Sequence, residues 1–147
     1  MEALARRKVS ADDYVDILDF YARQMHVLDA LNLEAYADTF TEDGAVDHAH
    51  RGERVEGRAA MMRSMEAALP RYRDVAVRHW FDHLLIEPAE NGWHVVYYSL
   101  VTRTDAEGKV DFEPTFTVED DLVRLGNGEI RTRLRVVHRD EPAGAGE

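Results

Sequence analysis

The hydrophobic residues of this chain change their spacing once along its length, from a helical period to a strand period. Before Asp74 the apolar residues recur every three or four positions, which places them on one stripe of a helix. The first stripe is formed by Tyr14, Ile17, Leu18, Tyr21, Met25 and Leu28. After Asp74, long runs rich in Val and Tyr alternate with turn residues, which is typical of antiparallel strands. Helices followed by strands predict an α+β domain, whose sheet can curl around the helices and leave a cavity.

Three helices are predicted in the first half. Ser10 can cap the first, and Asp13 three residues later completes a capping-box-like pattern. Asn32 can cap a short second helix, and residues 58–69 predict the third. One face of the second helix is expected to hold Leu33, Tyr36 and Phe40.

Between the second and third helices the pattern is less regular. Residues 41–44, Thr-Glu-Asp-Gly, are expected to close the second helix, and residues 45–49 to form a short strand. Gly52 and Gly57 are expected to bracket a charged turn.

The second half predicts four long strands, over residues 75–86, 93–103, 110–124 and 130–138. Pro114 indicates a bulge, a break or an edge, and residues 126–128, Gly-Asn-Gly, are a strong hairpin signal. In the last strand the arginines alternate with less polar residues, so the arginine face is expected to be wet. That face is Arg131, Arg133 and Arg135.

The length of 147 residues, 45% of them hydrophobic, suits one domain with one core. We expect this domain over 10–140, with a flexible N-terminus at 1–9 and a disordered tail at 141–147. The net charge of -11 disfavours nucleic acid and anionic membranes as partners. The chain has neither cysteine nor an apolar run approaching the roughly 20 residues of a membrane span. Its start lacks the apolar stretch of a secretory signal, so we expect a cytoplasmic protein.

Asp29 and His79 are the strongest candidates for catalytic residues. Asp29 ends the first helix at the edge of its apolar stripe, and His79 lies near the start of the first long strand. A carboxylate that faces an imidazole fixes the tautomer of the ring and makes it a better base. The alternative is a core histidine that is merely satisfied by a helix-end carboxylate.

The element order and several short segments together resemble the SnoaL-like branch of the NTF2-like superfamily, over roughly residues 12–138. This branch includes scytalone dehydratase, the bile-acid 7α-dehydratase and polyketide cyclases. The segments that carry the resemblance are Leu28-Asp29, Tyr36-Ala37-Asp38-Thr39-Phe40-Thr41-Glu42-Asp43-Gly44, Val55-Glu56-Gly57-Arg58, Arg78-His79 and Asp121-Leu122-Val123-Arg124. The resemblance implies an NTF2-like cone, in which the N-terminal helices pack in a strongly curved antiparallel sheet that encloses a pocket. It also implies a homodimer or homotrimer.

Carried over by position, Asp29 and His79 match the helix aspartate and strand histidine of these dehydratases. The region 102–104, Thr-Arg-Thr, lacks the second catalytic histidine of scytalone dehydratase, and Gln24 replaces a tyrosine of the bile-acid enzyme. We therefore expect a substrate different from that of either enzyme. His48 falls near a pocket tyrosine of scytalone dehydratase, and two further positions fall near its polar serine and asparagine. Those two are Thr117 and Glu119.

Further substrate contacts are predicted from the strand pattern. His83 follows His79 by four residues and shares its face if the strand is unbroken, and His48 and His50 likewise share a face. Tyr97 either packs in the core or donates a hydrogen bond to a substrate oxygen. The alternating polar residues form either a solvent face or a polar pocket wall. These are Thr117, Glu119 and Asp121.

We therefore expect a cofactor-independent acid/base enzyme, a dehydratase, isomerase or cyclase. Its substrate would be a bulky, largely apolar oxygenated molecule such as a polyketide, terpenoid or aromatic intermediate. His79 would transfer the proton and Asp29 would orient it. No metal is expected, because no His and carboxylate spacing is diagnostic of a metal site. The alternatives are a non-catalytic small subunit of an aromatic-ring-hydroxylating dioxygenase and a small-molecule-binding module.

Overall fold

The computed structural model describes residues 7–144. Of the predicted flexible ends, residues 1–6 and 145–147 lie outside the described residues. Val9 is partly buried and packs against the core, so the ordered domain begins slightly before the predicted residue 10.

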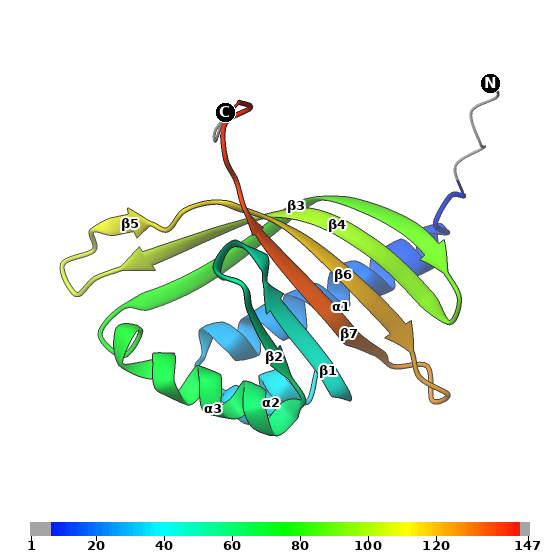
Figure 1. The fold of residues 1–147 in the computed structure, drawn as a ribbon, viewed down its shortest axis with the longest axis horizontal. Coiled ribbons are helices and arrows are strands. Elements are labelled where there is room, and N and C mark those ends of the chain that lie inside the picture. Colours follow the sequence, from blue (N-terminus) through cyan, green and yellow to red (C-terminus); the bar gives the residue numbers. More distant parts are fainter. Residues whose placement is uncertain (1–6, 145–147) are drawn as a thin grey trace.

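The predicted α+β architecture is confirmed. A curved, unclosed seven-stranded sheet has the order β2-β1-β7-β6-β4-β3, with β5 paired to β4. Figure 1 shows α1 crossing the curved sheet, while α2 and α3 lie near the end formed by β1 and β2. The helices are α1 (Ala11–Asp29), α2 (Leu33–Ala37) and α3 (Arg58–Ala68), with short 3-10 helices at Ala49–Arg51 and Leu69–Arg71. The strands are β1 (Phe40–His48), β2 (Glu53–Glu56), β3 (Ala76–Ala89), β4 (Gly92–Thr104), β5 (Val110–Phe112), β6 (Phe116–Arg124) and β7 (Ile130–Arg139).

The start of α1 follows the sequence pattern. The backbone N–H of Asp13 donates to Ser10 Oγ at 3.1 Å, which satisfies one of the free donors in the first turn. Ile17, Tyr21 and Met25 are buried on one face of the helix. This face packs onto the concave side of the sheet and fixes where the last turn of α1, and therefore Asp29, meets β3. No helix among residues 7–144 is long and apolar enough to cross a membrane.

The segment after α2 differs from the prediction. Phe40 begins β1 instead of extending α2, and residues 41–44 are an irregular part of that strand. The hydroxyl of Thr39 donates to the Tyr36 carbonyl at 2.6 Å, which competes with further helix and turns the chain. Residues 53–56 are not a turn but the edge strand β2, whose charges face water. One pairing in the sheet, β1 with β7, is parallel.

The predicted wet row of arginines is broken in β7. Leu134 pairs with Asp121, but Thr132 pairs with Leu122, so β7 contains one extra residue at this point. This bulge shifts the alternation by one position. As a result Arg135 points inward and is only 5% exposed.

A second bulge interrupts β3. Asp82 pairs with Tyr98 and Leu85 pairs with Val96, so two residues of β3 oppose one residue of β4. His83 lies in this bulge with a φ of 59°, and its side chain is exposed. The expectation that His83 shares the face of His79 is therefore wrong, because it assumed an unbroken strand.

Candidate active site

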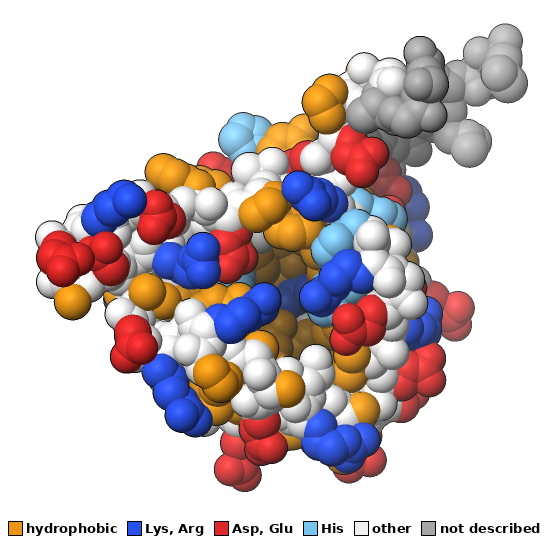
Figure 2. Space-filling view, turned by 60° about the vertical axis from the view of Figure 1, so that its left-hand side comes forward, with side chains coloured by type: hydrophobic (Ala, Val, Ile, Leu, Met, Phe, Trp, Pro, Cys, Tyr) orange, Lys and Arg blue, Asp and Glu red, His pale blue; other side chains and the backbone are white. Residues whose placement is uncertain are grey.

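A pocket of about 620 Å³ lies between α1 and β3. Hydrophobic side chains form most of its walls, and the polar lining residues are few. Figure 2 shows a hollow in the surface with hydrophobic side chains at its floor and Lys, Arg and His side chains along its rim. The pocket is lined from α1 by Leu18, Tyr21, Ala22, Met25, His26 and Asp29, and from β3 by Arg78, His79, Trp80, Phe81 and Leu84, with Ala30 after the helix.

Asp29 holds His79 at two points in this pocket. Oδ1 of Asp29 lies 2.7 Å from Nδ1 of the imidazole, and Oδ2 accepts the backbone N–H of His79 at 3.1 Å. β3 is an edge strand, so this N–H has no neighbouring strand to pair with. One carboxylate therefore satisfies the strand edge and fixes the orientation of the ring. The Asp29 side chain is 11% exposed and that of His79 is 24% exposed.

The position of Asp29 at the last residue of α1 has an electrostatic consequence. The C-terminal end of a helix carries partial negative charge, so a carboxylate there is disfavoured unless donors compensate it. The backbone N–H and the imidazole Nδ1 of His79 supply that compensation. With Nδ1–H donated to Asp29, the neutral ring keeps its lone pair on Nε2. This nitrogen has no hydrogen-bond partner among residues 7–144.

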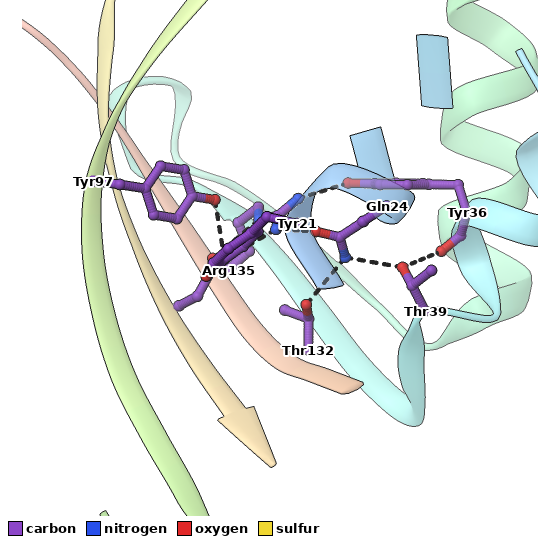
Figure 3. A network of polar contacts seen from close by, with 8 residues as sticks. Tyr21, Gln24, Tyr36, Thr39, Tyr97, Thr132 and Arg135 are labelled. Atoms are coloured by element: carbon purple, nitrogen blue, oxygen red, sulfur yellow. Dashed lines mark hydrogen bonds and ion pairs between the residues drawn. The ribbon is translucent and has the colours of Figure 1, made fainter. Parts of the chain in front are cut away.

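A second ion pair, fully buried, lies beside the pocket. Asp120 accepts four hydrogen bonds, from the Tyr21 and Tyr97 hydroxyls at 2.8 and 3.0 Å and from Nε and Nη2 of Arg135 at 3.0 and 2.9 Å. Arg135 also donates to the Tyr36 hydroxyl and to Gln24 Oε1. Figure 3 shows this network, which Gln24 extends to Thr39 and Thr132.

The buried network is built to hold fixed charges. Burial raises the pKa of Tyr21 and of Tyr97 well above the usual value, and the charge of Asp120 adds to both shifts. Burial opposes the charge of Arg135, but Asp120 and the neighbouring tyrosines raise the pKa of Arg135 well above its usual range. The network thus anchors Tyr21, which is also part of the pocket wall, and gives Asp120 no free access to a substrate.

Of the predicted site residues, the structure brings only Asp29 and His79 together in this pocket. Gln24 and Tyr97 are buried in the network around Arg135. Thr117 and Glu119 lie outside the pocket, with Thr117 bonded to Asp140 and Glu119 to His138.

The other predicted histidines lie away from Asp29. The ring of His48 makes an edge-to-face contact with His50, whose own ring contacts Phe116. Burial lowers the pKa of His48, and Arg51 adds to this effect. His83 contacts the ring of Tyr98, outside the pocket. Among residues 7–144, no group of three or more His, Asp or Glu side chains is arranged to hold a metal ion.

Three ionisable residues of the pocket lining were not predicted as site residues: Tyr21, His26 and Arg78. His26 precedes Asp29 by three positions on the same helix, so the two share a face, and this spacing could have identified it. Tyr21 was assigned only to the apolar stripe. Arg78 follows the opposite alternation to His79, and only the open edge of β3 brings it to the pocket.

The fold and the pocket define an NTF2-like protein that binds small molecules. The profile of the SnoaL-like domain matches residues 9–140, and the chain belongs to this family.

Solved structures of similar proteins agree with this assignment. Aln2 from a Streptomyces species is 38% identical, covering 91% of this chain and 95% of that chain with a TM-score of 0.86. A protein from Catenulispora acidiphila, solved in complex with S-DNPA, is 36% identical, covering 89% and 96% with a TM-score of 0.81. An NTF2-like protein with a cystatin-like fold from Novosphingobium aromaticivorans shares the fold at 19% identity, covering 91% and 86% with a TM-score of 0.74. A comparison with curated proteins gives no match.

Proposed function

We propose that this protein is a cofactor-independent acid/base enzyme of the dehydratase, isomerase or cyclase type. Its substrate would be a bulky, largely apolar oxygenated molecule, such as a polyketide, terpenoid or aromatic intermediate. The observation that carries the proposal is the 2.7 Å contact between Asp29 and His79 in the wall of an apolar pocket. Membership of the SnoaL-like family supports it.

The proposed reaction uses Nε2 of His79 as the proton carrier. Nε2 removes the proton next to a substrate carbonyl, and the C–H electrons form an enolate. In a dehydration, the imidazolium then returns this proton to the departing hydroxyl, so a C–O bond breaks, a C=C bond forms and water leaves. Asp29 stabilises the imidazolium between the two steps and holds the ring in place. Isomerisation and ring closure need the same first step.

The pocket favours this proposal over a purely structural role. A volume of about 620 Å³ with mostly apolar walls suits a molecule of several rings, and a bound molecule of that size would itself displace water from around the charged intermediate. A non-catalytic subunit does not require a free Nε2 of His79 in such a pocket. A binding module would use the pocket without proton transfer, so a test of the proposal must measure proton transfer itself.

Deuterium exchange of a bicyclic ketone provides that test. The probe is 2-tetralone in D₂O, because uptake of deuterium at its α-carbon reports proton removal without requiring a leaving group. We expect the wild type to accelerate the exchange over buffer, and His79→Gln to lose most of the acceleration. His83→Gln is the matched control, since His83 is exposed outside the pocket. Equal acceleration by wild type and His79→Gln would rule out His79 as the base.

A further inference from the structure

Two polar side chains in the pocket have hydrogen-bonding groups that the Asp29–His79 pair does not use. His26 lies on the α1 wall, and its imidazole has no hydrogen-bond partner among residues 7–144. Arg78 lies on the β3 wall, and within the same residues the only hydrogen bond of its side chain goes from Nη1 to the Val77 carbonyl at 2.7 Å. Both walls therefore offer free polar groups to a ligand.

The bond to Val77 locates the guanidinium of Arg78 at the open edge of β3. In an antiparallel ladder the N–H and C=O of one residue point to the same side, and the side alternates along the strand. The N–H of His79 points away from β4, towards Asp29, so the carbonyl of Val77 points that way too. A side chain that donates to this carbonyl must fold back along the same edge. Arg78 thus reaches the pocket although it follows the opposite alternation to His79.

The free N–H groups of Arg78 include two that point in the same direction. Nη1 is engaged, which leaves Nε–H and the parallel N–H of Nη2 on one side of the planar guanidinium. Two parallel donors at this spacing match the two oxygens of a carboxylate. A neutral carbonyl or hydroxyl can use only one of them.

The charges around the pocket favour an anion as well. The chain carries a net charge of -11, yet within residues 7–144 the only acidic residue that lines the pocket is Asp29, and its oxygens are bonded to His79. The remaining ionisable residues of the lining, apart from Tyr21, are Arg78, His26 and His79. Arg78 is thus a full positive charge in the lining, and no acidic side chain among residues 7–144 forms an ion pair with it, so its guanidinium is available to a negative group of a ligand.

We propose that the ligand of this pocket is a carboxylic acid whose carboxylate binds side-on to Nε and Nη2 of Arg78, with His26 facing it across the mouth. The inference rests on the proposed function, because it assumes that the substrate occupies the pocket beside His79. It narrows the substrate class to bulky apolar molecules that carry an acid group. Arg78 precedes His79 directly, so anchoring the acid also fixes the distance of the remaining substrate from Nε2.

The experiment compares an acid with its neutral isostere. The probes are 2-naphthylacetic acid and 2-naphthylacetamide, and isothermal titration calorimetry measures the binding of each. The proteins are the wild type, Arg78→Gln, Arg78→Lys, His79→Gln and the control Arg73→Gln. Arg73 is exposed before β3 and outside the pocket lining, so its replacement makes the same change in net charge.

We expect the wild type and Arg73→Gln to bind the acid about tenfold more tightly than the amide. Arg78→Gln should lose this preference, with a much smaller change in the binding of the amide, because the glutamine can still donate one hydrogen bond to a neutral carbonyl. Arg78→Lys should keep only part of the preference. His79→Gln should retain the preference, which separates this inference from the proposed catalysis. Equal affinities in the wild type, a preference that survives in Arg78→Gln, or no binding of either probe at millimolar concentration would each overturn the proposal.

Discussion

Two acid–base pairs with opposite designs lie on either side of Tyr21. Asp120 and Arg135 are both buried, and each nitrogen of the guanidinium and each oxygen of the carboxylate makes at least one hydrogen bond, to the other residue or to the surrounding tyrosines and Gln24. Asp29 and His79 are partly exposed, and their pair is left open at Nε2 of the imidazole. We call Asp120 and Arg135 the closed pair, because neither has a free atom that could contact a substrate. We call Asp29 and His79 the open pair, because Nε2 of His79 remains free.

The two pairs also differ in how their charges are stabilised. Removing two charges from water is costly, and the closed pair offsets that cost through the mutual attraction of its charges and through its hydrogen bonds. The open pair needs less compensation, because water or a ligand still reaches the ring. We therefore expect changes to Asp120 or Arg135 to act on folding, and changes to Asp29 or His79 to act on chemistry.

The largest expected effect is on stability at the closed pair. Asp120→Ala would leave Arg135 buried without its counter-charge, and we expect a loss of about 3–5 kcal/mol in the free energy of unfolding. Urea denaturation followed by circular dichroism measures it. Asp121→Ala is the control, because the adjacent carboxylate faces the outer surface and should cost less than about 1 kcal/mol. Similar losses in both variants would contradict the structural role of the closed pair.

At the open pair the effect should fall on activity. We expect His79→Gln to slow deuterium exchange of 2-tetralone by about 10²–10⁴-fold. Its free energy of unfolding should change by less than about 1 kcal/mol, because the ring is partly exposed and makes one side-chain hydrogen bond. If His79→Gln lost as much free energy of unfolding as Asp120→Ala, His79 would be a residue that stabilises the fold.

Asp29→Asn should weaken catalysis without abolishing it. An amide can still contact the ring, but it neither holds the Nδ1–H tautomer firmly nor balances the charge on the imidazolium. We expect the exchange rate to fall by about tenfold or more, less than in His79→Gln. The measurement is the same deuterium uptake, with binding of the ketone checked separately. An unchanged rate would mean that the carboxylate only caps the strand edge.

The smallest expected effect concerns two histidines outside both pairs. Hydrogen bonding to Asp121 raises the pKa of His94, so it favours folding below pH about 6.5, and this contribution is lost as the pH rises through the raised value. Burial lowers the pKa of His48, so its contribution is present above pH about 6.5 and is lost as the pH falls.

Thermal unfolding between pH 5 and 8 of His94→Gln and His48→Gln measures these contributions. For His94, which is partly exposed, we expect less than about 0.5 kcal/mol after solvent screening. The two variants should change the pH profile in opposite directions, and parallel changes would contradict the assignment.

The sequence predicted the features that depend on local patterns. The cap at Ser10 and the apolar stripe predicted α1, and the change of period at Asp74 predicted the order of the elements. The contact between Asp29 and His79 agrees with the pairing inferred from their positions in that order. Their catalytic role stays a prediction.

The features that could not be predicted from the sequence depend on strand register. One extra residue in β7 turns Arg135 inward, and one extra residue in β3 turns His83 outward. Neither bulge contains a glycine or proline by which it could have been predicted from the sequence. The parallel pairing of β1 with β7 joins segments far apart in the chain, beyond the reach of local periodicity. The closed pair was therefore invisible in the sequence, because Asp120 and Arg135 each lie on a strand whose face was uncertain or misassigned.

The tautomer of His79 is the most direct test of whether Asp29 prepares the ring to accept a proton. Long-range ¹H–¹⁵N NMR of the labelled protein, followed with rising pH until the imidazole is neutral, distinguishes the two ring nitrogens. We expect the neutral ring to carry its proton on Nδ1, bonded to Asp29, and we expect Asp29→Asn to weaken this preference. A wild-type ring protonated on Nε2 would contradict it, because the nitrogen that faces the pocket could then not accept a proton from the substrate.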